Sequence, residues 1–153
     1  NLNKTILNRR GMFSGSNEER IDMLQSILDS PKVKAIFFAR GGYGSIRILD
    51  KLNFNLFIKN PKWLIGFSDI TVFLCHISKM YNLPTLHSPM PFNFPGTSKN
   101  ALEELFNLLF GVKNSIKILA NKHNRKGVAS GKLIGGNLSI LCSLLNSESF
   151  PKT

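Results

Sequence analysis

Two short apolar runs, each followed directly by a turn and a helical pattern, constrain the fold of this chain more than any other feature. The runs are VKAIFF at residues 33–38 and WLIGF at residues 63–67. Each run has the length of a strand and is almost wholly apolar, which is typical of parallel sheets covered by helices on both faces. Strands that alternate with helices predict an α/β fold with a mostly parallel sheet flanked by helices.

The rest of the chain supplies further elements of the same alternation. Weaker strand patterns lie at residues 84–87 and 115–119, the second being either a fourth strand or a hairpin arm. We expect the strands at 33–38 and 63–67 to be parallel neighbours, because right-handed crossovers join them. Apolar residues at helical spacing predict helices at 17–29, 46–59 with a break near Asn53, 70–81, 98–110 and 137–145.

Length and hydropathy predict one globular domain. The chain has 153 residues, 42% of them hydrophobic, which is enough for a hydrophobic core. No apolar run approaches the ~18 residues that span a bilayer, and no signal-peptide core follows the basic opening. We therefore expect a cytoplasmic protein with no membrane partner. The first residue is Asn rather than Met, so an upstream segment with a targeting signal stays open.

The net charge of +11 raises nucleic acid as a partner, because Lys and Arg displace counterions from phosphates. The positive residues are scattered singly, however. The densest group, Lys122, Arg125 and Lys126, has no interleaved aromatic residues on which bases would stack. We expect a solvated basic surface and no nucleic-acid partner, and an acidic partner segment outside this chain would also explain the charge.

The two cysteines, Cys75 and Cys142, lie inside apolar helical patterns. Neither belongs to a CxxC pair or lies near a histidine cluster, so no metal site is predicted. We expect two buried free thiols, and a disulfide between them remains the alternative.

The strongest chemical signal is Gly66-Phe67-Ser68-Asp69, between an apolar run and a helix. A tight turn from strand to helix presents a serine hydroxyl at the edge of the sheet, as in a nucleophile elbow. Ile70 stands where the G-x-S-x-G pattern has its last glycine, which weakens an ordinary α/β-hydrolase interpretation. The structural alternative is that Ser68 caps the helix, because serine is favoured at N-caps.

A second signal is Gly41-Gly42-Tyr43-Gly44, directly after the first predicted strand. Ligands of open α/β sheets bind at the carboxyl ends of strands, and glycines there allow backbone N–H groups to approach an anion or a developing oxyanion. The spacing matches neither G-x-G-x-x-G nor a P-loop, so nucleotide binding is poorly supported. Alternatively, the glycines only permit the positive φ angles of a tight turn.

Four blocks resemble, in the same order, the signature blocks of the LD-carboxypeptidase family. They are ARGGYGSIRILDKL, NPKWLIGFSDIT, TLHSPM and GKLIGGNLSIL, and the resemblance spans roughly residues 17–145. It implies a cytoplasmic serine peptidase of peptidoglycan recycling that removes the terminal D-amino acid from L,D-linked murein peptides, without metal or organic cofactor. Some relatives in the family cleave microcin-type peptide nucleotides instead.

The resemblance also assigns roles to residues. The family nucleophile belongs to a G-[YF]-S-D block and falls on Ser68, and the oxyanion hole would be formed by the backbone N–H of Asp69 and of Gly41 or Gly42. The family's glutamate and histidine lie downstream of the G-G-N-L block, in a region that this chain lacks. The resemblance thus implies a nucleophile-bearing domain at 1–145 without its first strand, and the start of a linker to a missing C-terminal domain at 146–153.

No histidine of the chain is expected to replace the base. His87 belongs to the TLHSPM block, which supplies structure or substrate contacts, and His123 lies in a polar loop. His76 is eight residues after Ser68 on a helix, about 12 Å along its axis. We therefore expect this chain alone to be nearly inactive. Open alternatives are an inactive remnant or binding module of the same fold, a microcin-type peptide-nucleotide hydrolase, and assembly as a homodimer.

Overall fold

A three-stranded parallel sheet lies at the centre of the computed structural model, which describes residues 7–112 and 115–151. The strands are β1 (Ala35–Phe37), β2 (Trp63–Gly66) and β3 (Leu86–His87), and β2 is the middle one. Ile36 pairs with Leu64, and Gly66 pairs with His87. The predicted α/β class and the predicted parallel pairing of the first two strands are confirmed.

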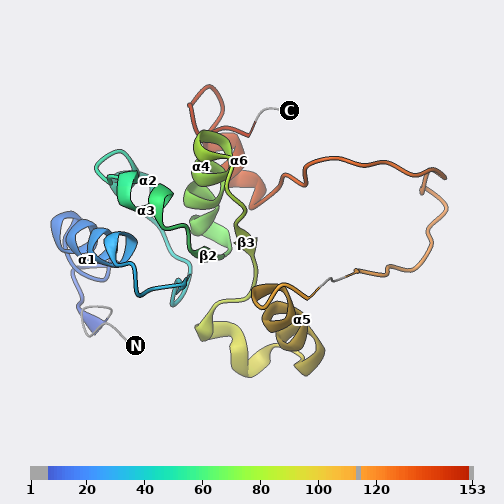
Figure 1. Cartoon of the computed structure of the whole chain (residues 1–153), viewed down its shortest axis with the longest axis horizontal. Coiled ribbons are helices and arrows are strands. Elements are labelled where there is room, and N and C mark those ends of the chain that lie inside the picture. The colour runs from blue at the N-terminus through green and yellow to red at the C-terminus, as the bar shows by residue number, and fades with distance from the viewer. Residues whose placement is uncertain (1–6, 113–114, 152–153) are drawn as a thin grey trace.

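Helices precede, connect and follow the strands. In Figure 1, α4 and α6 lie side by side, α1 lies near α2 and α3, and α5 stands apart at the other end of the molecule. The predicted break near Asn53 is confirmed as the gap between α2 and α3. The bounds are α1 (Asn17–Asp29), α2 (Ile46–Leu49), α3 (Asn55–Lys59), η2 (Ser68–Ile70), α4 (Thr71–Tyr81), η3 (Pro91–Gly96), α5 (Lys99–Leu109) and α6 (Leu138–Ser143).

The prediction of a fourth strand or a hairpin arm at residues 115–119 is wrong. Residues 115–119 have no regular secondary structure, and Ile116, Ile118 and Leu119 are 81%, 82% and 95% exposed. Their apolar alternation has no described strand to pair with, and an unpaired strand leaves its backbone polar groups without partners. The segment instead belongs to a wide excursion between α5 and α6, drawn in orange in Figure 1.

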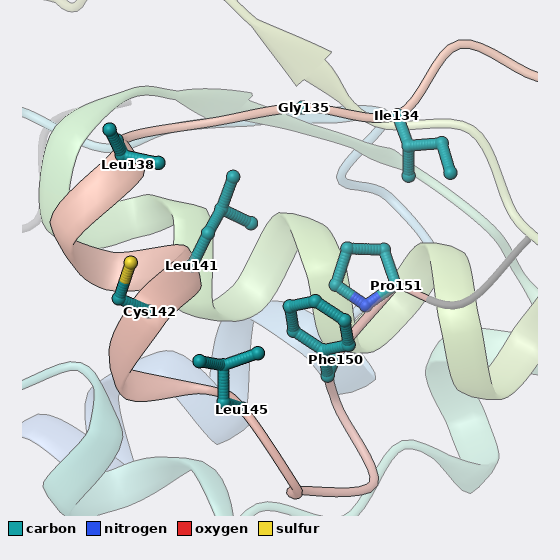
Figure 2. Close-up of a pocket in the computed structure, with 8 residues that line it drawn as sticks. All are labelled: Ile134, Gly135, Leu138, Leu141, Cys142, Leu145, Phe150 and Pro151. Atoms are coloured by element: carbon teal, nitrogen blue, oxygen red, sulfur yellow. The ribbon is translucent and has the colours of Figure 1, made fainter.

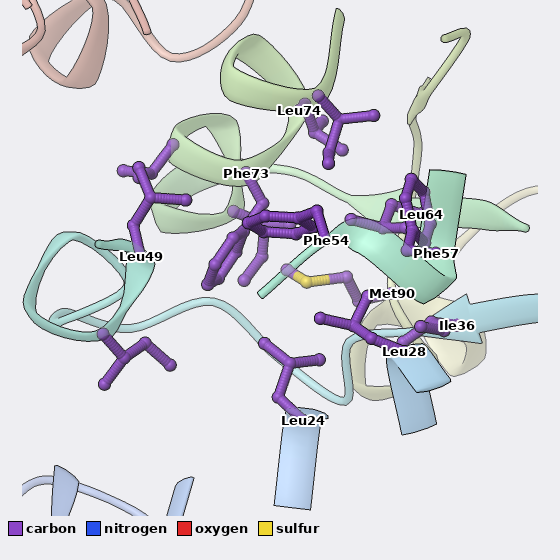
Figure 3. Packing of buried hydrophobic residues seen from close by; sticks show 14 residues of the cluster. Leu24, Leu28, Ile36, Leu49, Phe54, Phe57, Leu64, Phe73, Leu74 and Met90 are labelled. Atoms are coloured by element: carbon purple, nitrogen blue, oxygen red, sulfur yellow. The ribbon is translucent and has the colours of Figure 1, made fainter. Parts of the chain in front are cut away.

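One hydrophobic core fills the space between the sheet and the helices (Figure 3). Leu28 of α1, Leu64 of β2 and Phe73 of α4 are almost completely buried there. Phe73 also stacks on Phe38, with ring centroids 5.5 Å apart. Full burial of such a side chain is worth roughly 1.5–3 kcal/mol, so this core stabilises the packing of the helices on the sheet.

The cysteine prediction is half right. Both cysteines are free, and Cys75 is buried, but Cys142 is exposed. Its helix, α6, is short, and Leu138 on it and Leu145 just after it are exposed as well. Figure 2 shows the pocket of about 310 Å³ that this helix forms with Ile134, Gly135, Phe150 and Pro151. An apolar pattern predicts burial only where another element covers it, and this face of α6 lines an open pocket.

None of the helices in the described ranges has the length and the apolar composition that a membrane span requires.

Candidate active site

Ser68 lies in a sharp turn at the carboxyl end of the central strand. Its φ angle is 59°, in the left-handed region, which costs a residue other than glycine roughly 1–2 kcal/mol. Gly66 makes the turn possible, because a Cβ atom there would lie only 3.0 Å from Cγ2 of Ile70. The prediction of a strained strand-to-helix turn at Ser68 is therefore confirmed.

The hydroxyl of Ser68 does not cap the helix. Phe67 holds the N-cap position of η2, and no side chain forms a capping hydrogen bond there. Within the described ranges, Ser68 Oγ forms no hydrogen bond at all, and the residue is half-buried rather than covered. The capping interpretation is thus wrong for Ser68, and its hydroxyl is available to a ligand.

The glycine turn after β1 lies directly against Ser68. A Cβ atom placed on Gly41 would be 3.2 Å from Cβ and 3.4 Å from Oγ of Ser68, whereas one on Gly42 would meet nothing within 4 Å. Met90 lies on the same side of Gly41, with its Cε 3.5 Å from that added Cβ atom. The two loops meet because β1 and β2 are adjacent and parallel, so that their carboxyl ends share one edge of the sheet.

Asp69 joins the two loops through its side chain. Its buried carboxylate accepts hydrogen bonds from the backbone N–H of Ser45, at 3.0 Å, and from the Ser45 hydroxyl, at 2.7 Å. A buried carboxylate requires such partners, since desolvation without them is costly. The family resemblance implied only a backbone role for Asp69, because nothing in the local pattern shows that a residue 24 positions away will meet its carboxylate.

Arg20 supports the far end of the glycine turn. Its guanidinium donates to the Gly44 carbonyl at 3.4 Å and lies over the Phe13 ring, with its carbon 5.1 Å from the centroid. Gly44 has a φ of 116°, and a Cβ atom there would lie 2.8 Å from Phe13. Burial lowers the pKa of Arg20, and the negative charge of nearby Asp69 opposes that shift.

The fourth sequence block packs against the start of the helix that follows Ser68. Thr71 is completely buried, and its hydroxyl oxygen accepts a hydrogen bond from the Asn137 N–H at 3.1 Å. Gly136 approaches so closely that a Cβ atom there would overlap the Thr71 methyl group. The G-G-N block therefore lies within a few residues of the serine turn, although it is almost 70 positions away in sequence.

The three histidines are engaged elsewhere or exposed. Nδ1 of His76 lies 2.9 Å from Ser149 Oγ, and its ring packs on Phe54 and Tyr81. Burial lowers the pKa of His76, and the charges of Asp50 and Glu148 oppose this less strongly. His87 packs edge-on to Phe67, and His123 is exposed, as predicted. No histidine nitrogen in the described ranges is hydrogen-bonded to Ser68, and no three His, Cys, Asp or Glu side chains there could hold a metal ion.

The Asp69 bridge leads to a stability prediction. Asp69→Ala should lower the free energy of unfolding by about 3 kcal/mol, because two hydrogen bonds to a charged group are lost and the buried Ser45 donors are left unpaired. Asp69→Asn should lose less, since an amide oxygen can still accept both bonds. Chemical denaturation of the chain measures this, with the exposed Asp22→Ala as the matched control. Equal stabilities of Asp69→Ala and Asp22→Ala would contradict the bridge.

The fold and this geometry define an α/β protein that presents, at the carboxyl edge of a parallel sheet, a serine without a side-chain hydrogen bond to any described residue. The family described as LD-carboxypeptidase N-terminal domain matches residues 1–88, more than half of the chain. The chain therefore belongs to the LD-carboxypeptidase family.

Similar proteins agree with this assignment. The chain is 33% identical over 153 residues to a "probable murein peptide carboxypeptidase" of Bacillus subtilis, covering 95% of this chain and 47% of that protein. Its fold is similar to the crystal structure of muramoyltetrapeptide carboxypeptidase from Oxalobacter formigenes, with a TM-score of 0.86, 28% identity and coverage of 96% and 50%. A microcin C7 self immunity protein, at 23% identity, has a TM-score of 0.79 over 97% of this chain and 54% of its own, a likeness of fold alone. The chain spans about half the length of the relatives it matches.

Proposed function

We propose that this chain supplies the nucleophile half of an LD-carboxypeptidase. The whole enzyme would hydrolyse the L,D-amide bond to the terminal D-amino acid of murein peptides, in the cytoplasm and as part of cell-wall recycling. The observation that carries the proposal is the Ser68 hydroxyl, which forms no hydrogen bond with the described residues and is held in a left-handed turn beside Gly41. The names of the Bacillus and Oxalobacter relatives support the substrate class.

The chemistry proposed for the site is acyl transfer. Ser68 Oγ would attack the carbonyl carbon of the L,D-amide, while a general base takes its proton. The backbone N–H of Asp69 and one from Gly41 or Gly42 would stabilise the oxyanion, a contribution that typically amounts to several kcal/mol. The D-amino acid would leave with the proton on its amine, and water would then hydrolyse the acyl-enzyme. None of these steps requires a metal or an organic cofactor.

We assign the general base and its orienting glutamate to the C-terminal half of the family protein. Within the described ranges, no histidine is hydrogen-bonded to Ser68, and His76 is held by Ser149. On this proposal residues 1–145 are the nucleophile-bearing domain and residues 146–153 lead toward the other half. The isolated chain should then be nearly inactive, because loss of the base removes most of the catalysis of a triad.

Complementation tests the proposed function. The chain should release no measurable D-alanine from a murein tetrapeptide by itself, and should release it when it is fused to the C-terminal half of the Bacillus subtilis relative. Chromatography of free D-alanine is the measurement, and the C-terminal half alone is the control. An inactive remnant or binding module of the same fold would bind the tetrapeptide but release no D-alanine, both as the isolated chain and in the fusion. The reading frame that follows Thr153 in genomic DNA offers a second discriminator, since it should encode a glutamate and a late histidine.

A further inference from the structure

A second pocket lies at the same edge of the sheet as Ser68. It has a volume of about 290 Å³, and we call it the Asn93 pocket. Its lining comes from the residue before the nucleophile, from the last residue of β3 and from the chain that follows it. The lining residues are Phe67, His87, Ser88, Pro89, Asn93 and Thr97.

Asn93 brings an unsatisfied acceptor to this pocket. Its Oδ1 atom is buried and has no hydrogen-bond partner among the described residues. The rest of the residue is firmly held, because its backbone N–H donates to the Met90 carbonyl at 2.7 Å and its own carbonyl accepts the Thr97 hydroxyl at 2.9 Å. A buried oxygen without a partner is costly, and native structures contain few of them without a functional reason.

The chemistry of the lining selects the kind of ligand that could satisfy this oxygen. An anion would be repelled by an acceptor, an apolar group would leave it unpaired, and a metal ion would need more than one oxygen ligand. An N–H donor fits, and the N–H of a peptide bond is one. The Ser88 hydroxyl also lacks a hydrogen bond to any described residue and can donate to a carbonyl, while Phe67 and Pro89 provide an apolar wall.

We propose that the Asn93 pocket binds the backbone of a peptide, with one peptide N–H donating to Asn93 Oδ1. The terminal torsion of an asparagine side chain is broad and roughly two-fold, so a rotation that exchanges the amide nitrogen and oxygen can present the oxygen to the pocket. Because Phe67 lines the pocket and Ser68 follows it, a peptide held there passes beside the nucleophile. Only the identity of this peptide as the substrate rests on the proposed function.

Binding of a murein tetrapeptide tests the pocket without any need for catalysis. The probes are the tetrapeptide and its three ester analogues, in each of which one backbone N–H is replaced by oxygen. Calorimetry on the chain as it stands should show one analogue binding about 3- to 10-fold more weakly than the amide. Asn93→Leu should weaken the amide by the same factor and should erase the difference between that analogue and the amide. Asn93→Asp, which keeps an acceptor, should restore the difference.

Matched controls separate this inference from the proposed function. Asn107→Ala, on the exposed face of α5, should leave every dissociation constant unchanged. If Asn93→Leu does not fold, the comparison of esters on the unmodified chain still decides. Three results would overturn the pocket assignment. The first is equal affinity for all four probes, the second is an equal loss of affinity for all four in Asn93→Leu, and the third is no binding of the tetrapeptide. In that case, release of D-alanine by the complemented protein would still support the proposed function. Conversely, ester-selective binding without any release of D-alanine would overturn the proposed function and leave the pocket assignment intact.

Discussion

Replacing Ser68 by alanine is expected to lower D-alanine release by the complemented enzyme at least roughly 10⁴-fold, because removal of a triad nucleophile leaves only binding and the oxyanion hole. Stability should hardly change. The hydroxyl has no hydrogen bond to lose within the described ranges. The conformational free energy of a φ of 59° is also about the same for alanine as for serine. The thermal midpoint should therefore stay within a few degrees.

Initial rates and thermal scans on the same preparations provide the measurement. The matched control is Ser26→Ala, on the exposed face of α1, where the serine hydroxyl donates to the Met23 carbonyl of its own helix. That variant should keep full activity. Retained activity in Ser68→Ala would end the nucleophile assignment, and loss of folding would indicate a structural role for the serine.

Gly41→Ala should reduce turnover about 100-fold, because the added Cβ atom would lie 3.2 Å from the Ser68 Cβ and would push the nucleophile by a few tenths of an ångström. Small displacements of a reacting group are costly when the rate depends on alignment. Gly42→Ala should lose at least tenfold less activity, since its Cβ atom would meet nothing within 4 Å. Both variants keep their backbone N–H groups, so the comparison isolates the displacement of Ser68.

The readout is kcat for D-alanine release, with Gly131→Ala as the neutral control in an exposed segment with open space around it. The Michaelis constant should change less than kcat, because the contact is with the nucleophile. Equal activities of Gly41→Ala and Gly42→Ala would show that the close approach at Gly41 does not control the position of Ser68.

Local patterns predicted the parts of the fold whose burial is decided by the sheet itself. The runs that contain β1 and β2 are almost wholly apolar, and the turn at Ser68 follows from a glycine two residues earlier with a helix directly after it. The glycine turn met Ser68 as predicted, because adjacent parallel strands must end at one edge.

Patterns failed where the outcome depends on which element covers which. The segment 115–119 is mostly apolar, and Cys142 lies in an apolar pattern. Yet both are exposed, because no described part of the chain covers them. The pairing of Asp69 with Ser45 depends on the distance between separate loops, and so does the lack of a described partner for the Asn93 oxygen. No spacing rule within one segment encodes such distances, so these parts of the candidate site required three-dimensional coordinates.

The wide excursion between α5 and α6 has a consequence for how this fold can vary. Residues 115–131 are exposed and make no regular structure. The side chain of Lys132, just after them, donates to the Ser78 carbonyl of α4 and to the side chain of Asn82 at its C-cap. The entropic cost of closing a flexible loop grows only with the logarithm of its length, about 0.6 kcal/mol for each doubling. Insertions, deletions or a grafted reporter peptide can therefore be accommodated there, while Gly136 and Thr71 keep the helix behind Ser68 in register.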